Sequence, residues 1–204
     1  MNPLGTPSYL PGIDVSHFQG AIDWARVKAA GIGFAFIKAT DGNAFVDPQL
    51  NYNALGCQAV GLPFGFYHFF RPAIDPALQA QFFLANTKPY MAQLPPALDL
   101  EVGPMDNSQA ATWLDIVDVA LGREPLVYTA PAFAAQYLTS GPPIGVYPLW
   151  IAEYSTKPGP DVPKAWSDWE FWQHTAQGRV DGVPNAVDLD WFHGTGQDLG
   201  AWLK

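Results

Sequence analysis

Apolar residues gather in short runs that recur along the chain, separated by longer mixed segments. The runs occupy residues 12–15, 33–37, 64–67, 96–100, 126–128, 148–151, 170–173 and 186–190. Short runs with little alternation between apolar and polar positions are typical of strands buried on both faces, as in a parallel sheet covered by helices. The pattern therefore predicts an α/β fold.

Helical segments separate the earlier runs. Asp47 and Asp75 each precede a proline, a pair that is typical of an N-cap residue followed by the first residue of a helix. Residues 107–121 carry apolar side chains at spacings of three and four, which predicts an amphipathic helix. Glycines that tolerate positive φ stand where three helices should end, at Gly31, Gly61 and Gly122.

The alternation stops after residue 150. Residues 155–170 are rich in Pro, Asp and Trp, and the last two runs follow without an obvious helix between them. About eight strands and about five helices are expected in all, within the length of one domain. This predicts a single-domain barrel that begins as strand–helix units and finishes with plain strands.

Composition and charge exclude several classes of protein. Hydrophobic residues make up 49% of the 204 residues and charged residues 14%, which is the balance of a globular chain. The net charge of −9 makes nucleic acid an unsuitable partner, because phosphate binding needs a basic face. The apolar runs are too short to cross a bilayer, so no membrane segment is expected. Cys57 is the single cysteine, so no internal disulfide is expected.

The first residues, 1–10, are expected to form an N-terminal extension ahead of the domain at 11–204. They contain no basic segment, no continuous apolar segment and no small-residue cleavage site, so no signal peptide is predicted. If the protein works outside the cell, either its export signal is missing from this sequence or its release depends on something outside the chain.

Two carboxylates follow the fourth run. Asp99 and Glu101 are two residues apart on a predicted strand and therefore face the same side, whereas Leu98 and Leu100 face the other. Because two neighbouring carboxylates repel each other, one of them should hold a proton near neutral pH, as glycosidic bond cleavage requires. The same spacing also fits two solvated residues that close a strand.

Further acidic residues are expected beside this pair. Asp14 ends the first strand, where an N-cap or turn is the alternative interpretation, and Asp188 and Asp190 repeat the two-residue spacing near the C-terminus. A barrel places its first and last strands side by side, so we expect Asp14 and Asp188 to be neighbours. Catalytic groups of parallel barrels lie at the carboxyl ends of the strands, where these residues are found.

Other polar and aromatic residues near strand ends have two interpretations each. Lys38 is either a surface residue or a partner of the acidic residues. His17, His68 and His174 contain no closely spaced ligand pair, so no metal is expected, and His68 and His174 are expected to line a cleft. The aromatic residues that either stack on sugars or fill the core are Trp150, Tyr154 and Trp172.

With these residues assembled, the chain resembles the glycoside hydrolase family 25 lysozymes, the Chalaropsis-type muramidases. The resemblance runs from Gly12 to about Gly194 and rests on several segments in the same order. They are Gly12-Ile13-Asp14-Val15-Ser16-His17, Phe36-Ile37-Lys38-Ala39-Thr40-Asp41-Gly42, Gly65-Phe66-Tyr67-His68, Leu98-Asp99-Leu100-Glu101, Leu149-Trp150-Ile151-Ala152-Glu153-Tyr154, Phe171-Trp172-Gln173-His174 and Val187-Asp188-Leu189-Asp190-Trp191-Phe192.

The resemblance implies a TIM-like (β/α)5(β)3 barrel and hydrolysis of the β-1,4 bond between N-acetylmuramic acid and N-acetylglucosamine in bacterial peptidoglycan. It implies that Glu101 is the general acid, that Asp99 assists the 2-acetamido group of the substrate, and that Asp14 and Asp188 tune protonation. Asp41 stands where the family usually has Glu, and Asp190 where it often has Asn, which leaves fine substrate preference open. The residues expected to hold the substrate are Lys38, Tyr67, His68, Tyr128, Trp150, Tyr154, Trp172, Gln173 and Asp190.

No cofactor and no metal are expected, and nothing in the sequence demands more than a monomer. The expected place of action is extracellular, at the bacterial cell wall. Two alternatives stay open at this point: a sugar-binding barrel without turnover, which a broken acidic pair would favour, and a metal-dependent hydrolase, which sensitivity to EDTA would favour.

Overall fold

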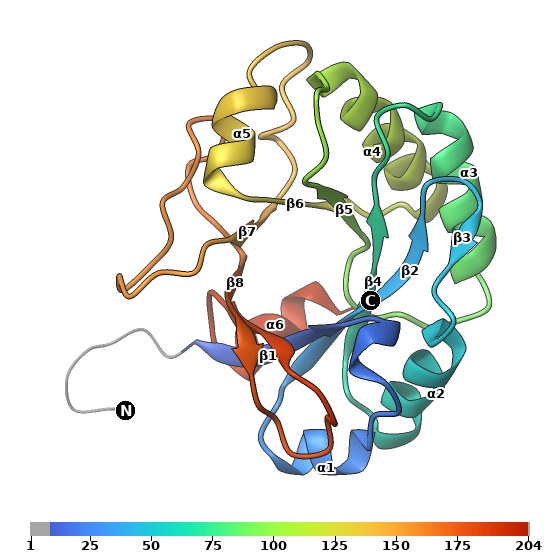
Figure 1. Cartoon of the computed structure of the whole chain (residues 1–204), viewed down its shortest axis with the longest axis vertical. Helices are drawn as coiled ribbons and strands as arrows, with labels where there is room; N and C mark the ends of the chain where they lie inside the picture. The colour runs from blue at the N-terminus through green and yellow to red at the C-terminus, as the bar shows by residue number, and fades with distance from the viewer. Residues whose placement is uncertain (1–8, 204) are drawn as a thin grey trace.

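The computed structural model describes residues 9–203 and contains a closed barrel of strands with helices outside it (Figure 1). Strand–helix units form most of its circumference. Their strands are β1 (Leu10–Val15), β2 (Phe34–Asp41), β4 (Phe64–Phe69), β5 (Ala97–Leu100) and β6 (Leu126–Thr129). The helices that follow these strands are α1 (Trp24–Ala29), α2 (Leu50–Val60), α3 (Pro76–Thr87), α4 (Asn107–Leu121) and α5 (Pro131–Tyr137).

Three further strands complete the ring without intervening helices. They are β7 (Leu149–Ala152), β8 (Phe171–Gly178) and β9 (Val187–Phe192). Neighbouring strands are parallel from β1 through β2 and β4 to β8, and β9 runs antiparallel to both β8 and β1. The predicted (β/α)5(β)3 barrel is therefore confirmed. The remaining elements are η1 (His17–Gln19), β3 (Phe45–Val46), α6 (Gly196–Leu199) and η2 (Gly200–Trp202).

Two apolar layers hold this barrel together. Side chains that point outward from the strands, such as Ile13, Leu98 and Val127, pack against the helices. Side chains that point inward fill the lower part of the barrel with aromatic rings, among which Phe36 stacks on Trp150 with ring centroids 4.4 Å apart. The inward-pointing positions turn polar only toward the carboxyl ends of the parallel strands, so the core forms a solid floor beneath them.

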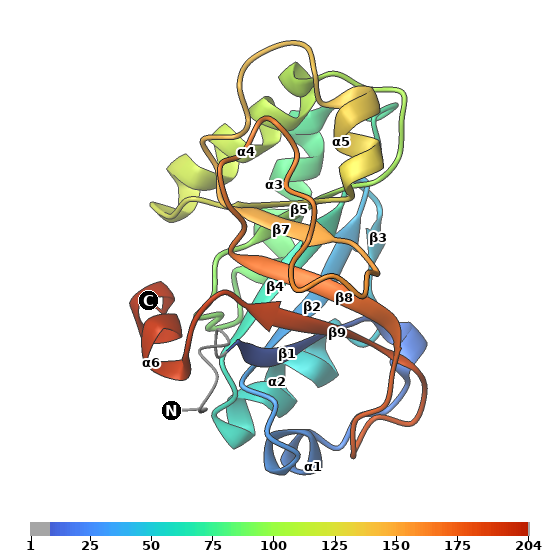
Figure 2. The same cartoon turned by 90° about the vertical axis from the view of Figure 1, so that its left-hand side faces the viewer.

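Within residues 9–203, no helix covers the side formed by β7, β8, β9 and β1, which Figure 2 faces. Tryptophans take the place of a helix there. Trp169 stacks on His193 at 4.2 Å, and the indole nitrogen of Trp166 donates to the Tyr147 carbonyl at 2.8 Å. This accounts for the Trp-rich composition of residues 155–170, because aromatic side chains on a loop bury the outer faces of these strands.

Most of the predicted helix boundaries are confirmed. Asp75 caps α3 with Pro76 as its first residue, and α2 and α4 end at Gly61 and Gly122 with φ of 63° and 59°. The prediction for Asp47 was wrong, because α2 begins at Leu50. The Asp47 carboxylate instead accepts hydrogen bonds from the backbone of His17 and of Gln49.

The predicted division into an extension at 1–10 and a domain at 11–204 falls within one residue of the start of β1. Residues 1–8 lie outside the described part of the chain, so this division stays a prediction. Within residues 9–203, no helix combines the length and the apolar composition needed to cross a bilayer.

Candidate active site

A polar cavity of about 280 Å³ opens at the carboxyl ends of the parallel strands. The residues that line it are Asp14, Ser16, Phe18, Gln19, Lys38, Tyr67, Phe69, Asp99, Glu101, Tyr128, Trp150, Tyr154, Gln173 and Asp188. A larger cavity of about 520 Å³ lies between α3 and α4, but its walls are mostly apolar and include no carboxylate. Chemistry rather than size therefore marks the first cavity as the candidate active site.

Asp99 and Glu101 lie at the end of β5 and enter the cavity from the same side, as their spacing predicts. Leu98 and Leu100 point away into the helix layer and are fully buried. Burial raises the pKa of Asp99 well above its usual range, and the charge of Glu101 raises it further. Within the described residues, the buried Oδ1 atom of Asp99 has no hydrogen-bond partner. The Asp99 residue is 5% exposed and lines the cavity, so part of its side chain is within reach of a ligand there.

Glu101 reaches solvent at the mouth of the cavity. Partial burial on the cavity side raises the pKa of Glu101, whereas the positive charges of Lys38 and Arg71 lower it. The net direction is upward, so this carboxyl group holds its proton to a higher pH than a free glutamic acid. An accessible carboxyl group with a raised pKa is suited to donate a proton to a bound substrate.

The seam between the first and last strands supplies a second group of carboxylates. Asp14 pairs directly with Asp188 in the antiparallel register of β1 and β9, as the sequence predicts. Burial raises the pKa of Asp14 well above its usual range, with further contributions from Asp190 and Asp188. Burial also raises the pKa of Asp188 to about 6, and the charge of Glu101 adds to the shift.

Asp190 lies below this pair and is fully buried. Its Oδ1 atom accepts a hydrogen bond from the indole nitrogen of Trp150 at 2.9 Å, and its Oδ2 atom has no partner among the described residues. Burial raises the pKa of Asp190 well above its usual range. Trp150 is itself 1% exposed and stacked on Phe36, so it serves as the floor of the cavity rather than as an exposed platform.

Gln173 connects the two sides of the cavity. Its Nε2 atom donates to Asp14 at 2.7 Å, and its Oε1 atom accepts from the hydroxyl groups of Tyr128 at 3.0 Å and Tyr154 at 2.8 Å. These bonds fix the amide orientation and leave Asp14 as an acceptor. Burial raises the pKa of both phenols, that of Tyr154 to about 12, so both remain neutral donors near neutral pH. Tyr154 is 60% exposed and forms part of the rim.

Lys38 belongs to the cavity rather than to the outer surface. Its side chain is 12% exposed, and its ammonium group lies 3.7 Å from Asp41 and 4.5 Å from the centroid of the Phe69 ring. The second of its two interpretations, a partner of acidic residues, is the one that the structure supports.

Three of the predicted substrate-binding residues do not line the cavity: Asp190, which is buried beneath it, His68 and Trp172. His68 is buried between the barrel and the helices, where it contacts Thr40 at 2.7 Å and stacks on Trp113. Trp172 points outward and donates to the Glu153 carbonyl at 2.8 Å. The positions of His68 and Trp172 have the same cause: side chains alternate along a strand, so the neighbours Tyr67 and Gln173 take the inward positions.

The remaining histidines also lie in structural environments. His17 bonds to Asp47 at 2.7 Å, and His174 stacks on Trp191 on the outside of the barrel. In residues 9–203, no three side chains of His, Cys, Asp or Glu are placed so that they could share a metal ion. The expectation that no metal takes part is nevertheless a prediction, which inhibition by EDTA would contradict.

Several cavity residues were not singled out from the sequence. Ser16 and Gln19 cap each other after β1, and this turn presents Phe18 with 72% of its surface exposed. Phe69 lines the cavity two residues beyond Tyr67 on β4. Its position could have been found from that spacing, whereas the exposure of Phe18 depends on the tight turn that only the structure displays.

Comparison with known proteins gives consistent matches over most of the chain. A sequence profile of the glycosyl hydrolases family 25 matches residues 13–183. Lysozyme M1 of Streptomyces globisporus is 34% identical over 208 residues, covering 94% of this chain and 70% of that protein. The uncharacterized protein YegX of Escherichia coli K12 is also 34% identical, over 94% of this chain and 72% of its own length. A crystal structure of a bacterial lysozyme from Streptomyces coelicolor superposes with a TM-score of 0.87 at 33% identity, over 96% of this chain and 97% of that one.

Proposed function

The chain belongs to glycosyl hydrolase family 25, and from this membership we propose that it is a lysozyme that cleaves bacterial peptidoglycan. It is a glycoside hydrolase, and the bond that we assign to it is the β-1,4 bond between N-acetylmuramic acid and N-acetylglucosamine. Relatives named lysozyme and N,O-diacetylmuramidase support this assignment. The observation that carries it is the pair at the end of β5, with Asp99 buried and Glu101 accessible in one cavity.

Glu101 is the general acid in this proposal. Its raised pKa keeps a proton available, and its place at the mouth of the cavity lets it reach the oxygen that links two sugars. As the glycosidic bond breaks, the proton passes to the leaving oxygen, and positive charge develops on the sugar ring that remains. The resulting carboxylate then takes a proton from the water that completes hydrolysis.

Asp99 assists the 2-acetamido group of the substrate. The acetamido oxygen attacks the anomeric carbon in place of an enzyme nucleophile, and the amide nitrogen becomes more positive as it does so. The Asp99 side chain, which lines the cavity, accepts the hydrogen bond from this N–H and thereby orients and stabilises the group. Asp14 and Asp188 control the protonation of the cavity, and Gln173 holds Asp14 in place.

The remaining cavity residues hold the glycan. Tyr154 offers an exposed ring at the rim, Tyr67 and Tyr128 line the walls, and Lys38 places a positive charge beside Asp99. No cofactor is required by this mechanism. We propose that the protein acts as a monomer, with residues 11–204 as the catalytic domain, on peptidoglycan in the cell wall or outside the cell, where its activity would lyse the wall.

Muropeptide analysis tests the proposal directly. Purified peptidoglycan is digested with the wild type and with Glu101→Gln, reduced with borohydride and analysed by mass spectrometry. We expect reducing-end muramic acid from the wild type and a rate lower by roughly 10²- to 10⁴-fold from the variant. Reducing-end glucosamine would assign a different bond, and an absence of products on several wall types would favour a sugar-binding barrel without turnover.

A further inference from the structure

Two positive side chains flank one aromatic ring at the edge of the cavity. The Lys38 ammonium group lies 4.5 Å and the Arg71 guanidinium carbon 4.4 Å from the centroid of Phe69. Asp41 accepts two hydrogen bonds from Arg71, from Nε at 2.6 Å and from Nη2 at 2.8 Å, and lies 3.7 Å from Lys38. We refer to these four residues as the Lys38–Arg71 cluster, which carries two positive charges against one negative.

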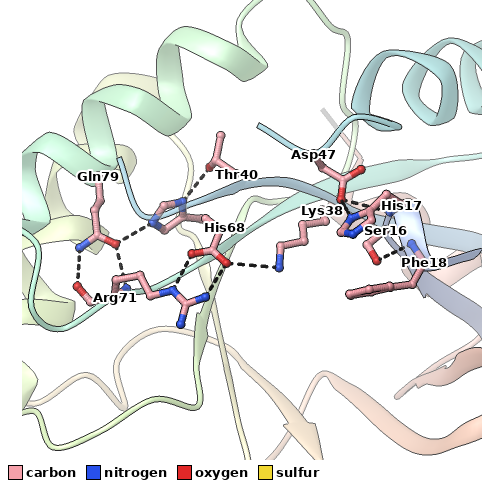
Figure 3. A network of polar contacts seen from close by, with 10 residues as sticks. Ser16, His17, Phe18, Lys38, Thr40, Asp47, His68, Arg71 and Gln79 are labelled. Carbon is pink, nitrogen blue, oxygen red and sulfur yellow. Dashed lines mark hydrogen bonds and ion pairs between the residues drawn. The ribbon is translucent and has the colours of Figure 1, made fainter. Parts of the chain in front are cut away.

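The backbone of Arg71 is held as firmly as its side chain. The buried amide of Gln79 on α3 accepts from the Arg71 backbone nitrogen at 2.9 Å and donates to its carbonyl at 3.0 Å (Figure 3). The Gln79 side chain also contacts His68 at 3.2 Å, which ties the loop to β4. Arg71 is nevertheless 44% exposed, and its Nη1 group has no partner among the described residues. The structure therefore presents a preorganised guanidinium edge to solvent beside the cavity.

Lys38 is the single lysine or arginine among the described residues that line the cavity. Lys157, in the loop after β7, lies between Glu153 and Asp161 and is outnumbered by them. The interior of the cavity holds Asp14, Asp99, Glu101 and Asp188. Neither the carboxyl groups of the interior nor the Lys157 side therefore offers an anionic group a net positive charge. The Lys38–Arg71 cluster carries a net positive charge at the edge of the cavity and attracts such a group.

We propose that the Lys38–Arg71 cluster binds a carboxylate of the peptide stem attached to the glycan. This inference rests on the proposed function, because it takes peptidoglycan as the substrate. The N-acetylated sugars of such a strand offer no charge, whereas the peptide stems carry free carboxylates. Arg71 Nη1 and Lys38 Nζ supply charge-assisted donors for one of them. The protein has a net charge of −9, so this local positive charge favours one orientation of the bound glycan. In that orientation, the peptide stem lies on the side of the cavity formed by β2 and β4.

Removal of the charge from the substrate tests this proposal. Soluble peptidoglycan strands are prepared in native form and with their carboxylates converted to amides by carbodiimide and ammonia. The kcat and KM of each enzyme are measured at its own pH optimum, because Arg71 also lowers the pKa of Glu101. We expect the wild type to show a KM about tenfold higher on the amidated strands, with a much smaller change in kcat.

Arg71→Met should raise the KM on native strands by a similar factor and remove the difference between the two substrates. Arg71→Lys, which keeps the positive charge, should recover part of the KM difference between the two substrates. Lys157→Met is the matched control and should behave as the wild type on both substrates, because its charge lies on the opposite rim.

Two results would overturn the inference while leaving the proposed function intact: equal KM values of the wild type on both substrates, or the same KM penalty for Arg71→Met on both. If the wild type releases no muropeptides from either substrate, the proposed function fails and the inference fails with it.

Discussion

Asp14 on the first strand and Asp188 on the last strand face each other across the seam that closes the barrel. Both side chains point into the cavity, and Asp190 lies directly below them. Neighbouring carboxylates repel one another when ionised, and here burial adds to that repulsion. The carboxyl groups that this seam brings together therefore destabilise the folded protein when they are ionised.

This seam makes stability depend on pH. Asp188 has a pKa of about 6 in the folded protein, against an ordinary value of 3.8, so the folded state binds the proton more tightly than the unfolded state. Its contribution to stability is complete below about pH 4 and is lost as the pH rises through 6. We expect the unfolding free energy of the wild type, relative to Asp188→Asn, to fall between pH 4 and pH 7. Thermal or urea unfolding of both proteins measures this difference, and a difference that does not vary with pH would contradict the assignment.

The pH dependence of activity should report on Glu101. Since the general acid must be protonated, activity should fall as the pH rises through its raised pKa. Lys38 lowers that pKa, so Lys38→Met should move the alkaline limb of the kcat profile to higher pH. The profile is measured on soluble strands at constant ionic strength. A limb that moves to lower pH, or a wild-type rate that rises through pH 9, would exclude the general-acid role.

Asp99→Asn should separate catalysis from stability. In the proposed mechanism the variant loses the carboxylate that assists the acetamido group, so kcat should fall roughly 100-fold or more. The melting temperature should stay the same or rise, because an amide removes the cost of burying a charge in this site. Kinetics on soluble strands and differential scanning calorimetry provide the two readouts. Lower activity together with a lower melting temperature would point to a structural role instead.

Gly12→Ala should weaken the barrel itself. A methyl group on Gly12 would lie 2.2 Å from the Phe34 ring, which is fully buried and packs against Phe171 with centroids 5.2 Å apart. We expect a loss of about 1–3 kcal/mol in unfolding free energy by urea titration. Gly159→Ala is the matched control, since no described atom lies within 4 Å of the added carbon. Equal stability of the two variants would mean that the Phe34 ring relocates at no cost.

The sequence predicted strands and helix ends best where a single local preference, such as helix capping, determined the structure. Apolar runs placed the strands, and Asp75 and Gly122 marked helix ends through capping preferences that need no tertiary information. The pairing of Asp14 with Asp188 followed from barrel closure, and the observed register confirms it. The order of elements was therefore predictable from the chain.

The site was less predictable because it depends on which side of a strand each residue takes. His68 and Trp172 were selected for their chemistry, although strand alternation next to Tyr67 and Gln173 already assigned them outward positions. Arg71 offered no local signal. Its place depends on Gln79, a buried amide on the following helix that fixes the loop only once α3 has packed against the barrel.

The closing seam also determines when activity first arises during synthesis of the chain. Glu101 leaves the ribosome about midway, but Asp188 and the strand that pairs with β1 come near the end. Contacts between such distant segments form late and slowly, because a long loop must close before they can be made. A nascent chain thus carries Glu101, the proposed proton donor, well before the cavity around it is complete. We therefore expect the cavity to form only after β9 has been synthesised and has paired with β1.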